Sequence, residues 1–172
     1  MDTYSHHIEQ TAELSADPSA VFAHLDDHRT IAAHMSGGSG MMMGGSMTYR
    51  YDAAEGRAEG STIRMEGRVA GFRLSVREVV AERDPPRRKV WHTEGPQRLV
   101  VMSAYRMGFD IAPTEAGTRL RVFCDYRLPK APLGRLLGWL LAATYARWCV
   151  GRIVQGAEAA LRPVAPHREN GT

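Results

Sequence analysis

Residues 117–148, GTRLRVFCDYRLPKAPLGRLLGWLLAATYARW, pass from one hydrophobic period to another. Every second residue from Leu120 to Tyr126 is apolar or aromatic, and most of the residues between them are charged, which is the pattern of a strand with one buried face. After two prolines, apolar residues recur at helical spacing until Pro163, which cannot continue a helix. The segment therefore predicts a strand followed by a long C-terminal helix.

Upstream of this segment, residues 47–128 follow a period of two. The alternation is interrupted by turn-forming stretches such as EGRAEG and RDPPRRK, so it indicates antiparallel strands joined by hairpins. We expect residues 99–111 to be one continuous strand of this series. One face of the predicted sheet is apolar and the other is rich in arginine.

The N-terminal part predicts one more strand and two short helices. Residues 5–14 alternate loosely and predict a strand. Asp17 is a good N-cap and the proline that follows it suits the first helical position, so a helix should begin there and bury Val21, Phe22 and Leu25. The acidic pair at 26 and 27 should end it, before a second short helix that carries an isoleucine and a methionine inward.

These elements predict an α+β fold in two layers, because a sheet with one apolar face must be covered by helices. The expected sheet is curved and antiparallel, has about seven strands, and wraps around the long C-terminal helix; the two short helices lie between strands 1 and 2. A strongly curved sheet that grips a helix leaves a cavity between them. We expect one domain over residues 1–162 and a mobile tail over 163–172.

This order of elements, together with four segments, resembles the SRPBCC superfamily of START-like proteins, which includes polyketide cyclases and dehydrases, coenzyme Q-binding proteins and lipid carriers. The resemblance covers nearly the whole chain and implies a helix-grip fold with a ligand cavity. One departure is that His34 and Met35 stand where the family often has an aromatic residue. The four segments are ADPSAVFAHLDD (16–27), EVVAERDPPRRKVWHTEGP (78–96), GTRLRVFCDYRLP (117–129) and LGRLLGWLLAATYARW (133–148).

Composition narrows the classes of partner. Lys and Arg number 22 against 19 Asp and Glu, and the basic residues are dispersed, so a nucleic-acid partner is not expected. The stretch 136–146 is far shorter than the ~20 apolar residues that span a bilayer. The N-terminus lacks a secretory pattern, and Cys124 and Cys149 are expected to be separate free thiols. We therefore expect a soluble cytoplasmic protein without a transmembrane segment; peripheral membrane contact and a homodimer are left open.

The expected ligand-binding residues lie on the inward parity of the strands and on the C-terminal helix. Several are hydroxyl groups, and a buried hydroxyl needs a hydrogen-bond partner. A ligand with oxygen-bearing rings would supply some partners, and bonds among the side chains themselves are the alternative. No cofactor is expected. The candidate residues are Tyr49, Tyr51, Met65, Leu74, His92, Ser103, Tyr105, Tyr126, Leu137, Leu141, Thr144 and Trp148.

Three further patterns leave alternatives open. His92 and Glu94 share a parity and would face the cavity as an acid–base pair, unless Trp91 is the inward residue. His24 and His28 are four apart, but two histidines do not complete a metal site, so none is expected. The Gly- and Met-rich segment 36–46 is either an apolar lid over the cavity or a segment without function.

Three functions follow from these observations. The first is binding of a small hydrophobic or aromatic molecule of lipid, polyketide, sterol or quinone type. The second, which the resemblance implies, is a polyketide cyclase, aromatase or dehydratase, although no catalytic motif of the family can be transferred residue by residue. The third is a protein-interaction module that docks through Trp139, Val150 and Ile153 on the terminal helix. The groups that would carry acid–base chemistry in the second case are Tyr105, Tyr126, His92 and Glu94.

Overall fold

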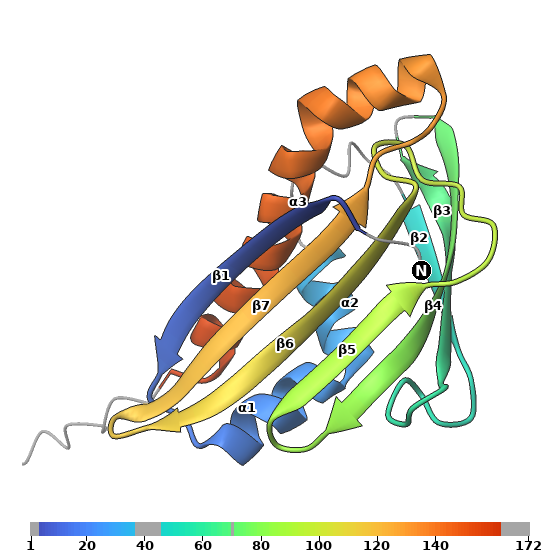
Figure 1. The fold of residues 1–172 in the computed structure, drawn as a ribbon. Helices are drawn as coiled ribbons and strands as arrows, with labels where there is room; N and C mark the ends of the chain where they lie inside the picture. Colours follow the sequence, from blue (N-terminus) through green and yellow to red (C-terminus); the bar gives the residue numbers. More distant parts are fainter. Residues whose placement is uncertain (1–3, 37–45, 70, 163–172) are drawn as a thin grey trace, which may run out of the picture.

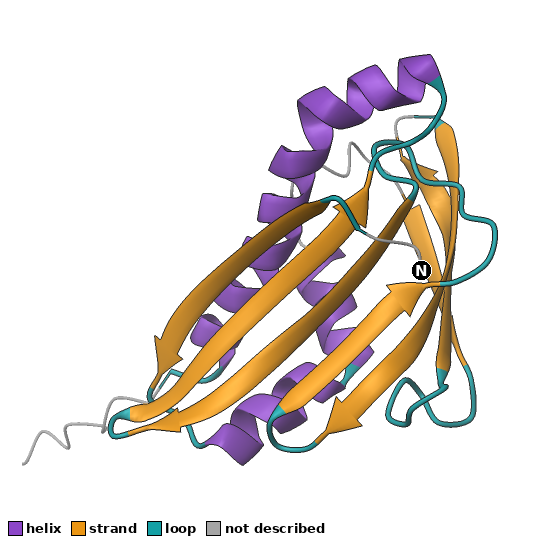
Figure 2. Ribbon diagram, viewed as in Figure 1, coloured by secondary structure: helices purple, strands orange, loops and turns teal. Residues whose placement is uncertain are grey.

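The computed structural model describes residues 4–36, 46–69 and 71–162, which form one curved antiparallel sheet with helices packed on its inner face (Figure 1). Within these ranges there are seven strands and three helices (Figure 2). The predicted α+β fold, with two short helices between strands 1 and 2, is confirmed. The elements are β1 (His6–Leu14), α1 (Pro18–Asp26), α2 (His28–Ser36), β2 (Ser46–Tyr51), β3 (Thr62–Val69), β4 (Phe72–Asp84), β5 (Arg88–Thr93), β6 (Ala104–Thr114), β7 (Gly117–Arg127) and α3 (Pro132–Ala160).

The strands lie in the order β1-β7-β6-β5-β4-β3-β2, and every neighbouring pair is antiparallel. Hairpins join β2 through β7 in sequence. The first strand pairs with the last, with Ile8 opposite Cys124, while α1 and α2 carry the chain from β1 at one edge of the sheet to β2 at the other. The segment 37–45, which contains most of the expected lid, and the expected tail at 163–172 lie outside the described residues.

Local sequence accounts for the first helix as predicted. The carboxylate of Asp17 accepts a hydrogen bond from the backbone N–H of Ser19 at 2.8 Å, and Pro18 occupies the first helical position. Val21 and Leu25 are fully buried below it. The helix ends at Asp26 and α2 begins two residues later, so the acidic pair separates the two helices as expected.

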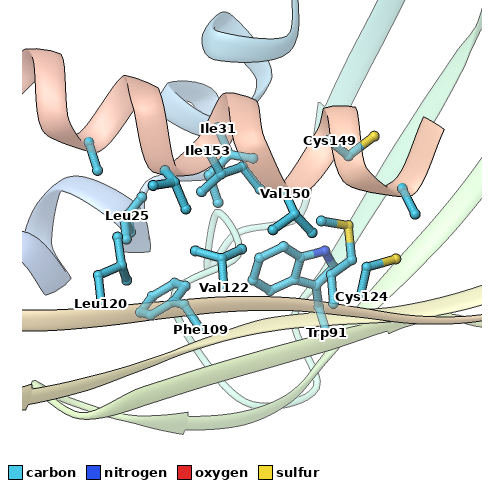
Figure 3. Packing of buried hydrophobic residues seen from close by; sticks show 14 of the residues in the cluster. Leu25, Ile31, Trp91, Phe109, Leu120, Val122, Cys124, Cys149, Val150 and Ile153 are labelled. Carbon is cyan, nitrogen blue, oxygen red and sulfur yellow. The ribbon is translucent and has the colours of Figure 1, made fainter. Parts of the chain in front are cut away.

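The main core lies between α3 and the strands β6 and β7. Figure 3 shows Val150 and Ile153 of the helix facing Phe109, Leu120 and Val122 of the sheet. All five side chains have at most 1% of their surface exposed. This half of α3 is therefore fixed by packing, which is the chief source of helix stability in proteins.

The packing of α3 contradicts the interaction surface that was expected on this helix. Val150 and Ile153 belong to the core, so the interaction surface expected on Trp139, Val150 and Ile153 is wrong as a single exposed face. Both sides of this helix are apolar in sequence, and periodicity alone does not distinguish them. The exposed apolar residues instead gather in its N-terminal half, which extends past the ends of β6 and β7 (Figure 1). They are Leu136, Leu137, Trp139, Leu140 and Leu141.

The strand expected over 99–111 is shorter than predicted, because β6 begins only at Ala104. Its neighbour β5 pairs with it no further than His92 opposite Arg106. Residues 99–103 therefore lack a strand partner on that side and form a loop, although residues 99–102 are apolar as in a strand.

Strand β4 contains a register shift between Val80 and Glu82. Before the shift, Val80 pairs with Trp91; after it, Arg83 pairs with Lys89. An extra residue in one strand turns the side chains that follow to the opposite face. The shift therefore places Arg83 on the same inner face as Val80, where it reaches α1.

Candidate functional site

A cavity of about 430 Å³ lies between the inner face of the sheet and the helices α2 and α3. Its wall is mainly apolar, with residues such as Ile63, Val76 and Met107 from three different strands. The loop 99–102 closes part of the same wall. The apolar run that was expected to continue a strand therefore lines the cavity from a loop.

Seven of the twelve predicted binding residues line this cavity, and they come from five elements of the fold. Leu141 is 49% exposed although it lines the cavity, so the cavity reaches the surface beside this part of α3. The aromatic members add hydroxyl groups to a mainly apolar wall, of the kind that fix the orientation of a ligand. The seven residues are Tyr49, Tyr51, Met65, Leu74, Tyr105, Leu141 and Thr144.

His92 does not line the cavity, because its neighbour Trp91 is the residue of β5 that faces inward. Trp91 is 2% exposed and belongs to the cavity wall, whereas His92 pairs with Val79 and Arg106 on the other face. Glu94 is exposed and forms an ion pair with Arg77 at 3.2 Å. Of the two alternatives that the sequence left open, the structure has the one in which Trp91 faces inward and His92 and Glu94 are turned away from the cavity.

The other four predicted residues do not line the cavity. Ser103 donates a hydrogen bond to the carbonyl oxygen of residue 128 at 3.1 Å. The ring of Tyr126 stacks on the ring of His6 with 5.0 Å between centroids. The ring of Trp148 stacks on that of Tyr145 with 5.9 Å between centroids. Leu137 is partly exposed on the N-terminal half of α3. Each of the three polar or aromatic side chains thus already has a partner within the protein.

Glu78 is a buried carboxyl on the cavity wall, with 5% of its surface exposed, and the sequence analysis did not include it. The hydroxyl of Tyr105 on β6 donates a hydrogen bond to its Oε1, and the indole of Trp91 provides another. Burial raises the pKa of Glu78 to about 7, although both hydrogen bonds act in the opposite direction. Alternation along β4 was the available signal, since Glu78 lies between Val76 and Val80 on the inner parity.

His28, the first residue of α2, faces Glu78 across one end of the cavity. Its Nε2 lies 4.0 Å from Oε2 of Glu78, and its ring meets Trp91 edge-on with 4.9 Å between centroids. Burial and the neighbouring charge of Lys89 lower the pKa of His28 to about 3, so the ring is neutral at physiological pH. Among the residues that the structure describes, no hydrogen-bond partner of Nε2 is present.

Lys89 lies behind His28 and is fully buried. Its ammonium group has three acceptors: the carbonyl oxygen of Asp26 at 2.6 Å, Oδ1 of Asp26 at 2.8 Å, and Nδ1 of His28 at 3.3 Å. Arg83 also donates to Asp26, at 2.8 Å from Nη2. Burial opposes ionisation of Asp26, but the hydrogen bonds from Arg83 and Lys89 outweigh it and hold its pKa below the ordinary value. The cluster thus fixes the junction of α1 and α2 on the sheet.

The two cysteines and the pair of His24 and His28 were the remaining candidates for a reactive thiol or a metal site. Both cysteines are free and buried, and burial raises the pKa of Cys149 to about 12, which disfavours a reactive thiolate. Within residues 4–36, 46–69 and 71–162, no three His, Cys, Asp or Glu side chains are grouped so as to hold a metal ion. His24 and His28 lie on different helices. None of the described helices is both long and apolar enough to cross a membrane.

A curved sheet around a long helix is also found in known proteins. The family described as polyketide cyclase / dehydrase and lipid transport matches residues 5–163, and the chain belongs to this family, which is of the SRPBCC type. A search of curated proteins found no match.

Solved structures extend this likeness to the whole fold. TTHA0849 from Thermus thermophilus is 16% identical with a TM-score of 0.66, over 91% of this chain and 97% of that one. Ara h 8.0201 is 12% identical with a TM-score of 0.61, over 91% and 97% of the two chains. The di-domain ARO/CYC StfQ from the steffimycin biosynthetic pathway is 11% identical with a TM-score of 0.62, and the match covers 90% of this chain and half of that one. At these identities the likeness shows the fold alone.

Proposed function

We propose that this protein binds a small hydrophobic or aromatic molecule, of lipid, polyketide, sterol or quinone type, in the cavity between the sheet and α3. The observation that carries the proposal is the cavity itself, about 430 Å³ with a mainly apolar wall. This volume lies in the usual range of small-molecule sites, about 300–1,000 Å³. The family description, which includes both cyclases and lipid transport, supports the same class of ligand.

The expected affinity is moderate. Burial of about 300 Å² of apolar ligand surface contributes about 7 kcal/mol at ~25 cal/mol per Å², before the costs of association are subtracted. We therefore expect dissociation constants that are micromolar or weaker for a purely apolar ligand. The hydroxyl groups of Tyr49, Tyr51 and Thr144 on the wall would select ligands that carry oxygen atoms.

A dye-binding experiment with a matched pair of variants tests this proposal. Met65 lines the cavity, and its neighbour Glu66 is exposed on the other face of β3. Met65→Trp would fill part of the cavity and should weaken binding of N-phenyl-1-naphthylamine at least about tenfold, which corresponds to ~1.4 kcal/mol. Glu66→Trp adds the same side chain outside the cavity and should bind as wild type does. Absence of dye binding by the wild-type protein, or equal binding by Met65→Trp, would contradict the proposal.

A further inference from the structure

The polar end of the cavity contains groups that retention of an apolar molecule does not require. Glu78 and His28 both line the cavity, and each is 5% exposed. Burial of a carboxyl or an imidazole opposes folding unless each finds hydrogen-bond partners. Their atoms Oε2 and Nε2 lie 4.0 Å apart, which is too far for a direct hydrogen bond. A ligand group in the cavity beside these two atoms would contact both of them.

The ring of His28 offers a donor to the cavity. Lys89 Nζ has only protons to donate, so the Nδ1 atom of His28 at 3.3 Å is the acceptor. The single proton of the neutral ring must then be on Nε2. This N–H group has no acceptor among the described residues, and it belongs to a residue of the cavity wall.

Glu78 offers an acceptor oxygen beside this donor. Tyr105 donates to Oε1, and the indole of Trp91 also binds the carboxyl, so the group is held in one orientation. Oε2 is the oxygen close to His28. A donor and a basic oxygen side by side match a ligand that accepts a hydrogen bond at one atom and releases a proton near it.

We propose that Glu78 and His28 form a proton-transfer site for ketones: His28 Nε2–H binds the carbonyl oxygen of the substrate, and Oε2 of Glu78 removes a proton from the carbon next to that carbonyl. This proposal rests on the proposed function, because the ketone must first enter the cavity. The carbonyl oxygen and its α-carbon are two bonds apart, a shorter distance than the gap between the two side chains, so each can meet one of them.

The reaction is balanced without a cofactor. The α C–H bond breaks, its proton forms an O–H bond with the Glu78 carboxylate, and its electron pair becomes the C=C bond of an enolate. The carbonyl π electrons move onto oxygen, where the N–H of His28 stabilises the developing charge. Return of the proton from Glu78 to carbon regenerates the carboxylate, so the net change is tautomerisation or exchange of the α-hydrogen.

The ionisation of Glu78 agrees with this geometry. A general base works best when its pKa lies near the working pH, and burial brings the pKa of Glu78 to about 7. The rate should therefore rise with pH through this value as the carboxylate forms. Tyr105 acts as a positioning residue, since its hydrogen bond favours the ionised carboxyl. Lys89 lies behind His28, and the other titratable groups that line the cavity are His28, Tyr49, Tyr51, Tyr105, Cys124, Tyr145 and Cys149.

Deuterium exchange into 2-tetralone, a bicyclic aromatic ketone, tests the proposal. The full-length protein is incubated with the ketone in D2O, exchange at the α-carbons is followed by NMR, and binding is measured separately by isothermal titration calorimetry. Wild type should accelerate exchange over buffer. Loss of a general base costs about 10²–10⁴-fold, so Glu78→Gln should lose at least about 100-fold of the acceleration while it binds the ketone within about threefold of wild type.

Two further variants separate catalysis from a structural effect. Tyr105→Phe removes a hydrogen bond that favours the carboxylate, so the midpoint of the pH–rate profile should move to higher pH. Glu94→Gln changes an exposed carboxyl on the outer side and should exchange deuterium at the wild-type rate. Circular dichroism confirms that each variant is folded.

The outcomes distinguish this proposal from the binding function. Wild type that binds 2-tetralone without accelerating exchange would overturn the proton-transfer site and leave the binding proposal intact. Folded Glu78→Gln with wild-type exchange would overturn the role of Glu78. No binding of either 2-tetralone or the naphthylamine dye would overturn both proposals together.

Discussion

Replacement of Glu78 by glutamine should make the protein more stable at alkaline pH and change its stability little at acidic pH. The folded state raises the pKa of this carboxyl from 4.5 to about 7, so it binds the proton more tightly than the unfolded state does. Stability linked to this proton is therefore complete below pH 4.5 and is lost as the pH rises through about 7. Glutamine has nearly the same shape and cannot ionise, so the variant avoids this loss.

The magnitude follows from the same values. One pKa unit corresponds to about 1.4 kcal/mol, so ionisation of Glu78 in the folded state costs about 3 kcal/mol of the free energy of unfolding. The difference in stability between Glu78→Gln and wild type should therefore increase by about 3 kcal/mol between pH 4 and pH 8.5. Titration of Asp26 and His28 occurs in both proteins and largely cancels in this difference.

Urea unfolding at a series of pH values, followed by tryptophan fluorescence, measures this difference. The slope of stability against urea should be the same for both proteins, because they expose the same surface on unfolding. Glu94→Gln is the matched control, since it makes the same substitution at an exposed carboxyl, and its free energy of unfolding should differ little from that of wild type. A stability difference for Glu78→Gln that stays constant within about 0.5 kcal/mol across this range would refute a carboxyl with a raised pKa.

Three other substitutions test the fold around the site, each by urea or thermal unfolding. Lys89→Met should destabilise the protein by about 3–5 kcal/mol, because it leaves the buried carboxylate of Asp26 with fewer partners. Lys130 is exposed, so Lys130→Met should change stability by less than ~0.5 kcal/mol. Similar effects of the two substitutions would contradict the structure. Gly108→Ala should cost about 1–3 kcal/mol, because the new Cβ would lie 2.6 Å from a backbone oxygen and 2.8 Å from the ring of Phe123; wild-type stability would show that this contact relaxes freely. Asp17→Ala should cost about 1 kcal/mol through loss of the N-cap of α1, while Asp17→Asn should retain most of it.

Sequence patterns predicted the fold because each element carries a local signal. The Asp17–Pro18 pair sets the start of α1, and alternation along residues 117–127 sets β7. The same signals do not report what packs against an apolar residue. Residues 99–102 are apolar and line the cavity, and the alternation there does not distinguish a loop from a strand.

The candidate site was harder to predict, since its central groups meet only in the folded protein. Alternation puts Glu78 on the inner face, but a carboxylate is usually exposed, and its partners come from β5, β6 and α2. Trp91 and His92 are adjacent, so a short strand did not show which of them faces inward. In the sequence, His28 is notable only for its helical spacing from His24, which does not complete a metal site. In the fold, its environment is determined by Lys89, which is distant in sequence.

The register shift in β4 divides this strand into two independent halves. Upstream of Ala81 the strand contributes a carboxyl to the cavity, and downstream it contributes the guanidinium of Arg83 to Asp26 on α1. Deletion of Ala81 would restore strict alternation, because Val80 and Arg83 would keep their partners Trp91 and Lys89, so Arg83 would stay on the inner face with Glu78. Loss of this single residue in a related chain would therefore preserve both the polar end of the cavity and the attachment of the helical layer, and a sequence alignment of such a relative needs a gap there to keep Arg83 in register.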